Sequence, residues 1–88
     1  MKTARELERH LKGIASYRRI EILLIISKKE GITLDQIAEG LDCNMKTISE
    51  HTRKLSLAGL VNKKYEGLSV HHTLSPYGKK FIHFIKLF

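Results

Sequence analysis

Hydrophobic residues recur at helical spacing in the first third of the chain. Leu7, Leu11 and Ile14 repeat every three or four positions with charged residues between them, which predicts an amphipathic helix over roughly 3–12. A second helix is predicted over 16–28, with a serine as its N-cap. Apolar residues cover most of the circumference of this second helix, which is typical of a helix in the centre of a core.

The next segment predicts two helices joined by a short turn. The sequence TLDQ forms a capping box, in which the Thr33 hydroxyl accepts a backbone hydrogen bond and Gln36 reaches back to the cap. A short helix follows, and after the turn DCN an asparagine caps a longer helix over 44–58. Ile48 and Leu55 lie one heptad apart on this longer helix and are expected to face the core.

Beyond this helix the hydrophobic period changes from helical to alternating. Val61 and Tyr65 alternate with polar residues, as does the stretch 68–74, and the dipeptide EG between them predicts a two-residue hairpin turn. Ser75 then caps a last helix that begins with a proline. The order helix, helix, helix–turn–helix, hairpin, helix predicts one mainly α-helical domain over 1–88, a winged helix-turn-helix.

The composition indicates the kind of partner and the cellular compartment to expect. The chain has 88 residues, of which 42% are hydrophobic, which suits one small packed domain. The net charge of +7 favours a polyanion, but charge alone does not separate DNA from RNA, from an anionic membrane or from a solubility feature. No apolar run reaches the ~18 residues of a membrane span, and the charged N-terminus has no signal-peptide core. We therefore expect no membrane partner and a cytoplasmic location.

Several segments resemble the ArsR-type winged-helix transcriptional regulators. SYRRIEIL resembles an early helix of that family, TLDQIAEGLDCNMKTISEHTRKLSLAGLV its helix-turn-helix, and HHTLSPYGKKF the strand that leads into its last helix. The similarity covers roughly residues 11–80, and the chain is short for the long dimerisation helices of the related MarR-type proteins. The resemblance implies a homodimer that binds a pseudo-palindromic operator and usually represses. Thr52 departs from the family's usual leucine, and Glu50 places an acid on the DNA-facing side.

The N-terminal half of helix 44–58 is the predicted reading element. It is the part that enters a major groove about 12 Å wide, and Lys46 and Arg53 suit phosphate or guanine. Glu50 either accepts from a cytosine amino group or pairs with a basic residue of its own helix. Lys63, Lys64 and Tyr65 are predicted at the tip of the wing 60–74, where they are expected to lie over phosphates. The predicted DNA-binding residues are Thr33, Gln36, Asn44, Lys46, Thr47, Ser49, Glu50, Arg53, Lys63, Lys64 and Tyr65.

Several alternatives remain open for these and neighbouring residues. On an isolated helix the same pattern would be a solvated face, and the basic wing would be an ordinary solvated hairpin. Arg18 and Arg19 either contact phosphate or only flank the core helix, and either Thr52 or His51 completes the inward face of helix 44–58.

The last helix predicts a dimer. Its end is apolar on most of its surface, and one small monomer cannot bury both sides. The first helix supplies a matching stripe, so we predict a two-fold dimer through the first and last helices, with reading helices roughly 34 Å apart. The predicted interface residues are Leu7, Leu11, Phe81, Phe84, Ile85 and Phe88.

The cysteine and the histidines do not form a metal-binding pattern. Cys43 is alone, His83 has no acid on its helix, and the adjacent His71 and His72 point to opposite faces of a strand. Because a transition-metal site needs three or four converging ligands, we predict no metal and no cofactor. A ligand pair across a dimer, and a redox role for Cys43 before a helix N-terminus, are the alternatives.

The sequence therefore predicts a sequence-specific regulator of transcription that binds double-stranded DNA and acts as a repressor. No nucleophile has an evident base, and no glycine-rich phosphate loop is present, so we predict no enzymatic activity. The alternatives are a weakly specific, chromatin-like DNA-binding protein and a winged helix used as a protein-interaction module. No residue pattern identifies a small-molecule effector.

Overall fold

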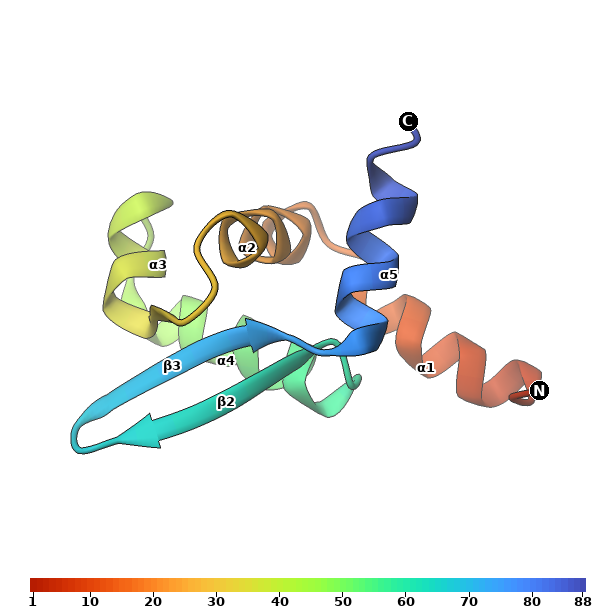
Figure 1. The fold of residues 1–88 in the computed structure, drawn as a ribbon, viewed down its shortest axis with the longest axis horizontal. Coiled ribbons are helices and arrows are strands. Elements are labelled where there is room, and N and C mark those ends of the chain that lie inside the picture. Colours follow the sequence, from red (N-terminus) through yellow and green to blue (C-terminus); the bar gives the residue numbers. More distant parts are fainter.

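The computed structural model describes residues 1–88 and contains five helices and three strands (Figure 1). In chain order they are α1 (Ala4–Ile14), α2 (Tyr17–Lys28), β1 (Ile32–Thr33), α3 (Leu34–Gly40), α4 (Met45–Leu57), β2 (Val61–Glu66), β3 (Ser69–Leu74) and α5 (Pro76–Ile85). The predicted order of helices and hairpin is confirmed, and β1 is an element that the sequence pattern did not reveal. No helix has the length and apolar character needed to cross a bilayer.

Each helix begins directly after a side chain that accepts a hydrogen bond from the third residue of the helix. These N-caps are Thr3, Ser16, Thr33, Asn44 and Ser75. Such a side chain satisfies one of the backbone N–H groups that the first turn leaves without a partner. The helix starts were predictable for this reason, since the bond joins residues only three positions apart.

The three strands form one antiparallel sheet in the order β1–β3–β2. Glu66 pairs with Ser69, so the hairpin loop is Gly67–Leu68 rather than the predicted Glu66–Gly67. Gly67 has a φ of +59°, a left-handed conformation that glycine adopts at little cost in a two-residue hairpin loop. The prediction placed the turn one residue too early because EG and GL both contain this glycine.

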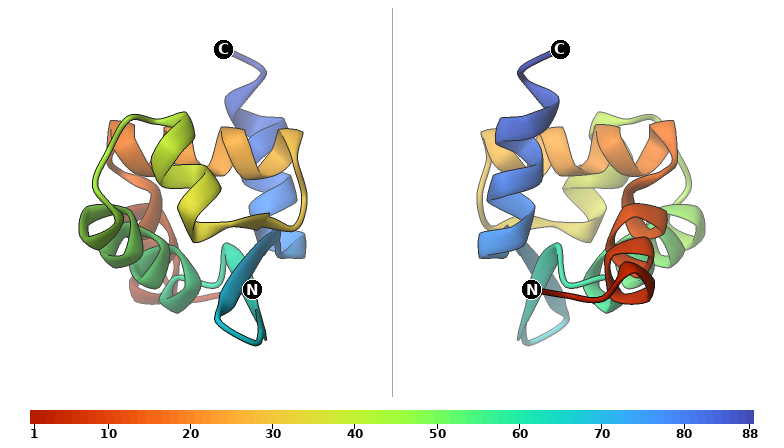
Figure 2. Two further views of the ribbon diagram at one scale, coloured as in Figure 1. Left: turned by 90° about the vertical axis from the view of Figure 1, so that its left-hand side faces the viewer. Right: turned by 90° about the vertical axis from the view of Figure 1, so that its right-hand side faces the viewer.

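The core surrounds α2, as its broad apolar surface predicted. Ile22, Leu23 and Ile26 are fully buried, and α4 contributes Ile48 and Leu55 from the other side. Figures 1 and 2 show α2 lying between α3 and α5, with the hairpin below it. This arrangement fixes the inner face of α4 and therefore also fixes which of its side chains remain exposed.

Helix α1 contacts the core through Ile14 and leaves the rest of its apolar stripe exposed. Ile14 is buried, but Leu7 and Leu11 keep 44% and 55% of their surface exposed. His10 takes the inward position instead, where its Nδ1 lies 2.6 Å from the carbonyl oxygen of Ala58. Only the C-terminal end of α1 reaches the core, since the helix projects away from the domain (Figure 1). The three-residue apolar stripe is therefore divided between core and surface.

Candidate nucleic-acid interface

The burial of one side of α4 leaves a polar stripe on the other side. Ile48, Thr52 and Leu55 are fully buried, and the Thr52 hydroxyl donates to the Ser49 carbonyl oxygen at 3.0 Å. Thr52 rather than His51 therefore completes the inward face, because its hydroxyl has an acceptor within its own helix and costs little to bury. The exposed stripe contains Lys46, Ser49, Glu50 and Arg53, as predicted.

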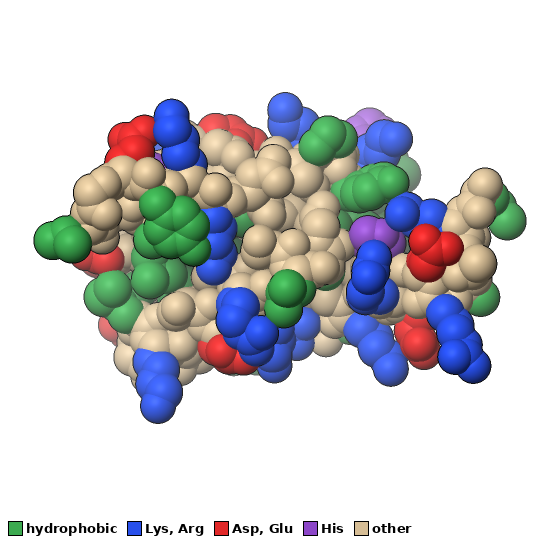
Figure 3. All heavy atoms as spheres, turned by 90° about the horizontal axis from the view of Figure 1, so that it is seen from below, with side chains coloured by type: hydrophobic (Ala, Val, Ile, Leu, Met, Phe, Trp, Pro, Cys, Tyr) green, Lys and Arg blue, Asp and Glu red, His purple; other side chains and the backbone are tan.

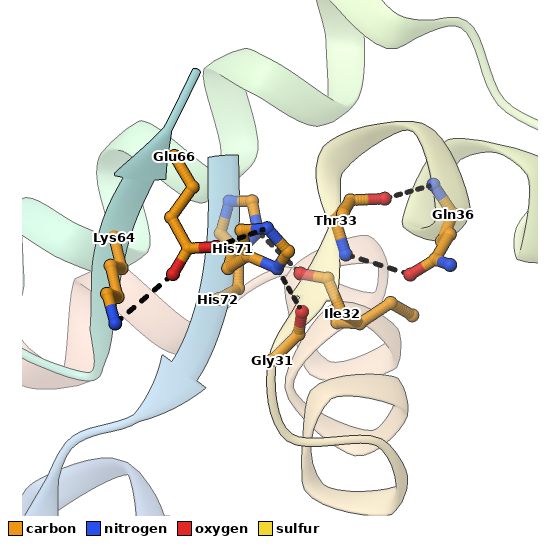
Figure 4. A network of polar contacts seen from close by, with 8 residues as sticks. All are labelled: Gly31, Ile32, Thr33, Gln36, Lys64, Glu66, His71 and His72. Carbon is orange, nitrogen blue, oxygen red and sulfur yellow. Dashed lines mark hydrogen bonds and ion pairs between the residues drawn. The ribbon is translucent and has the colours of Figure 1, made fainter. Parts of the chain in front are cut away.

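The caps of α3 and α4 occupy several of the predicted DNA-binding groups. Asn44 Oδ1 accepts from the backbone N–H of Thr47 at 2.8 Å. Thr33 Oγ1 accepts from Gln36 N at 3.3 Å, and Gln36 Oε1 accepts from Thr33 N at 3.1 Å (Figure 4). The amide NH₂ groups of Asn44 and Gln36 and the hydroxyl hydrogen of Thr33 remain as donors for an external acceptor.

Glu50 and Arg53 form an ion pair on the exposed stripe. Arg53 Nε donates to Glu50 Oε2 at 3.2 Å, and Arg53 Nη2 donates to Glu50 Oε1. This hydrogen bonding lowers the pKa of the Glu50 carboxyl, and the neighbouring charge of Arg53 acts in the same direction. Both side chains are about half exposed, so water screens the pair. Of the two roles considered for Glu50, pairing within the helix is the one present in the free protein.

The basic residues of the wing do not lie at its tip, contrary to the prediction. Lys63 and Lys64 pair with His72 and His71 in the middle of the hairpin, and the tip is formed by Gly67 and the fully exposed Leu68. Alternation along β2 sends neighbouring side chains to opposite faces. The wing therefore presents its two lysines to two different environments.

These environments differ in charge. Lys63 lies on β2, which packs against α4, and burial, followed by the charge of Arg53, lowers its pKa. Lys64 Nζ lies 3.2 Å from Glu66 Oε1, and Glu66 Oε2 lies 3.8 Å from His71 Nε2 (Figure 4). Lys63 thus adds positive charge next to Arg53, whereas the charge of Lys64 is partly balanced within the wing.

The histidines of β3 hold β1 against the hairpin. His71 Nδ1 donates to the Gly31 carbonyl oxygen at 2.8 Å, and His72 Nδ1 donates to that of Ile32 at 3.1 Å (Figure 4). No group of three or more histidine, cysteine or acidic side chains converges anywhere in the chain. Cys43 is a half-buried free thiol that packs against the core.

The two arginines at the start of α2 serve the fold. Arg19 Nη1 donates to the carbonyl oxygens of Lys12 and Gly13 at 3.1 and 2.9 Å, which caps the C-terminal end of α1. Arg18 Nη1 donates to Glu21 Oε1 at 3.2 Å on the same helix. In the free protein, both arginines therefore make hydrogen bonds within the chain.

The face that carries the wing, α4 and α1 is strongly basic. Figure 3 shows lysine and arginine side chains spread along its whole length, with acidic side chains between them at several places. Four of the predicted dimer residues leave apolar surface uncovered, whereas Phe81 and Ile85 are partly buried against the core. Leu7, Leu11, Phe84 and Phe88 are exposed, and a pocket of about 240 Å³ opens beside Phe84 on α5.

The chain was compared with known proteins. The model of a helix-turn-helix domain family matches residues 2–64. The transcriptional activator HlyU of Vibrio cholerae serotype O1 is 32% identical over 65 residues, which cover 74% of this chain and 59% of HlyU. The chain thus aligns with less than two thirds of the length of this curated relative.

Solved structures share the fold over nearly the whole chain. Reduced HlyU from Vibrio cholerae superposes with a TM-score of 0.83 at 26% identity, covering 93% of this chain and 86% of HlyU. A homodimeric winged helix-turn-helix DNA-binding domain from Mycobacterium bovis, a possible ArsR-family regulator, gives 0.84 at 22% identity, covering 98% and 85%. The predicted fold and family resemblance are confirmed. The chain belongs to the helix-turn-helix domain family, and its fold is the winged helix of ArsR-type regulators.

Proposed function

We propose that this protein is a homodimeric transcriptional regulator that binds double-stranded DNA. The exposed polar stripe of α4 carries the proposal, because buried residues on the opposite side hold it outward on the same basic face as the wing. In this arrangement the N-terminal half of α4 enters the major groove and the wing lies along the backbone. The relatives are consistent with this function, since HlyU is named a transcriptional activator.

The residues of the stripe divide into two roles. Lys46 and Ser49 contact phosphates or base edges near the start of α4, and Arg53 makes the two-point contact that guanine or phosphate offers to a guanidinium. Arg53 first has to leave Glu50, and the exposure of both side chains makes this exchange inexpensive. Lys63 lies near Arg53 and neutralises the backbone beside the same groove.

The remaining predicted DNA-binding residues lie beside this stripe, in the caps of α3 and α4 and on the wing. The NH₂ groups of Asn44 and Gln36 donate to phosphates, because their amide oxygens are already bonded within the helix caps. Thr33 and Thr47 lie in the same caps at the starts of α3 and α4, where backbone N–H groups favour an anion. Lys64 and the exposed Tyr65 contact the backbone from the wing.

The homodimer joins α1 and α5 of two copies. The apolar residues left exposed on these helices in one copy would be covered by the same residues of the other, in a two-fold contact. The Mycobacterium bovis domain with this fold is described as homodimeric. The sign of regulation stays a prediction, because the family resemblance implies repression whereas HlyU is named an activator.

The test begins with enrichment of genomic fragments on the purified protein, followed by fluorescence anisotropy with the enriched duplex at several salt concentrations. We expect log affinity to fall linearly with log salt. Arg53→Ala should weaken binding by about 1–3 kcal/mol and relax sequence preference. Lys28→Ala, on α2 outside this interface, is the control and should change neither.

The outcomes separate the alternatives. Salt-dependent binding without any enriched sequence would indicate the weakly specific, chromatin-like protein instead. A lack of salt-dependent binding to any duplex would contradict the proposal and favour the protein-interaction module. Unchanged affinity and preference in Arg53→Ala would show that α4 is not the reading element.

A further inference from the structure

A basic pocket lies between α1, α2 and α4, outside the predicted DNA-binding residues. It has a volume of about 220 Å³, and its lining includes Arg9, Lys12, Arg19 and Lys54 but no carboxylate. Four cations from three helices thus surround one hollow. The lip on the α4 side is Leu57, which is well exposed.

The negative C-terminal ends of the helices neutralise only part of this positive charge. Both α1 and α4 end beside the pocket, and each C-terminus carries about half a negative charge. Glu8, whose Oε2 lies 3.6 Å from Lys12 Nζ, adds one more negative charge at the rim. Together these amount to roughly two negative charges against four cations. The pocket therefore keeps a surplus of about two positive charges, which neither the helix ends nor Glu8 neutralise.

Arg19, which lines the pocket, has a donor without an acceptor. Arg19 is held by Nη1, which donates to the last carbonyls of α1. Its Nε is buried and has no hydrogen-bond partner, although a guanidinium nitrogen can only donate. Nearby, His51 Nδ1 is buried and unpartnered as well. Burial and then the charge of Arg19 lower the pKa of His51, which is consistent with a positive local field.

The pocket continues the reading face of α4. Lys46, Glu50, Arg53 and Leu57 follow one another at helical spacing along a single exposed stripe that ends at the pocket. This stripe rises about 16 Å, whereas the major groove is about 12 Å wide. A helix that enters the groove obliquely with its N-terminal half therefore brings its other end over a flanking backbone. Figure 3 shows α1 on this same face.

We propose that this pocket holds a backbone phosphate of the DNA that α4 reads, which makes α1 a third contact element beside the helix-turn-helix and the wing. The inference rests on the proposed function. A phosphate in this hollow would be bound by cations from three helices and would neutralise part of the surplus charge. Contacts of this kind position a protein on the duplex without reading its sequence.

The double variant Arg9→Gln, Lys54→Gln tests the pocket, because both side chains are exposed and their loss should leave the fold intact. Lys28→Gln, Lys79→Gln removes the same charge from exposed positions elsewhere and is the matched control. Affinity for the enriched duplex and for a random 30-base-pair duplex is measured against salt. We expect the pocket variant to lose about 0.9 from the log–log slope for each phosphate contact removed, with sequence preference retained. The control should keep the wild-type slope.

A second readout is the NMR resonance of the Arg19 Nε–H, which should shift when duplex is added and should not shift with inorganic phosphate at equal ionic strength. Equal slopes for the pocket and control variants would overturn the inference. Saturable binding of inorganic phosphate that the pocket variant abolishes, with an unchanged DNA slope, would also overturn it and assign the pocket to a small phosphate ligand. If the wild-type protein does not bind duplex at all, the proposed function itself fails, which is a distinguishable result.

Discussion

At the scale of single residues, Glu50 restrains the most versatile side chain of the reading helix. Arg53 donates two hydrogen bonds to Glu50 in the free protein, so it must exchange this partner for DNA. The acid also repels the phosphates that approach α4. Both effects oppose binding to any duplex, and they make Glu50 a residue that lowers non-specific affinity.

We therefore expect Glu50→Gln to raise affinity for a random duplex by roughly 3- to 10-fold at low salt, since one repulsive charge near phosphates is removed. Fluorescence anisotropy measures the change. Glu39→Gln, an exposed residue near the end of α3, removes the same charge and is the control. A selective loss of affinity for an enriched sequence, with no gain on random duplex, would instead identify Glu50 as a reader of a cytosine amino group.

The burial of His72 leads to a prediction of how stability depends on pH. It is fully buried, its Nδ1 donates to Ile32 O, and its Nε2 has no partner. Burial lowers its pKa, and the charge of Lys63 adds to this effect, whereas the bond to Ile32 opposes it. Since the folded pKa is below the unfolded value of about 6.5, the unfolded state binds more protons in acid.

Stability should therefore be complete above about pH 6.5 and fall as the pH decreases through that value toward the folded pKa. Urea denaturation between about pH 8 and pH 5 measures the decrease. In His72→Gln the decrease should be smaller, although not absent, because burial also lowers the pKa of His51. His83→Gln, at an exposed position on α5, should keep the wild-type dependence. Equal dependence in both variants would contradict the assignment.

At the scale of elements, the helices pack closely at two glycines. A methyl group on Gly78 would collide with the carbonyl oxygen of Leu60, and one on Gly13 would collide with the side chain of Ala58. The first contact brings α5 against the start of the wing, and the second brings α1 against α4. These glycines allow the helices to approach, although neither lies in a conformation that requires glycine.

We expect Gly78→Ala to lower the free energy of unfolding by about 1–3 kcal/mol, because the obstacle is a backbone oxygen that cannot rotate away. Gly40→Ala is the matched control. Its new methyl group would meet only the flexible end of Ile25, at 2.8 Å, and alanine favours the helix by up to ~1 kcal/mol. Chemical denaturation compares the two. A Gly78→Ala variant as stable as wild type would mean that α5 moves away from the wing at little cost.

The elements also differ in how far their sequence predicts them. The caps at Thr33, Asn44 and Ser75 were predictable because each bond joins residues three positions apart. Strand β1 was not, since its two residues form a strand only by pairing with His71 and His72 some forty positions later. The hairpin was expected, but its register depends on which side of Gly67 the loop closes.

At the scale of the whole molecule, the exposed apolar residues of α1 and α5 are the remaining feature that one chain does not explain. Phe84 and Phe88 pack edge to face with their ring centroids 5.3 Å apart, and both are exposed. Leu7 and Leu11 are exposed on α1. Surface of this kind is unusual on a monomer and suits a two-fold contact.

We expect sedimentation velocity to show a dimer at micromolar concentration, and Phe84→Glu to convert it to a folded monomer by burying a charge at the contact. Leu68→Glu, at the fully exposed tip of the wing, places the same charge elsewhere and should remain dimeric. A stable wild-type monomer, or a dimer unaffected by Phe84→Glu, would contradict the proposed interface. The monomeric variant should also lose affinity for a two-half-site duplex.

The sequence by itself determined the helices, their caps and the outward stripe of α4, because periodicity and capping act over three or four residues. The tertiary structure alone decided that His10 faces the core and that β1 joins the sheet. It also decided that Arg19 caps α1 and lines a basic pocket with Arg9 and Lys54. These contacts join distant segments, and their geometry is set by how the helices pack.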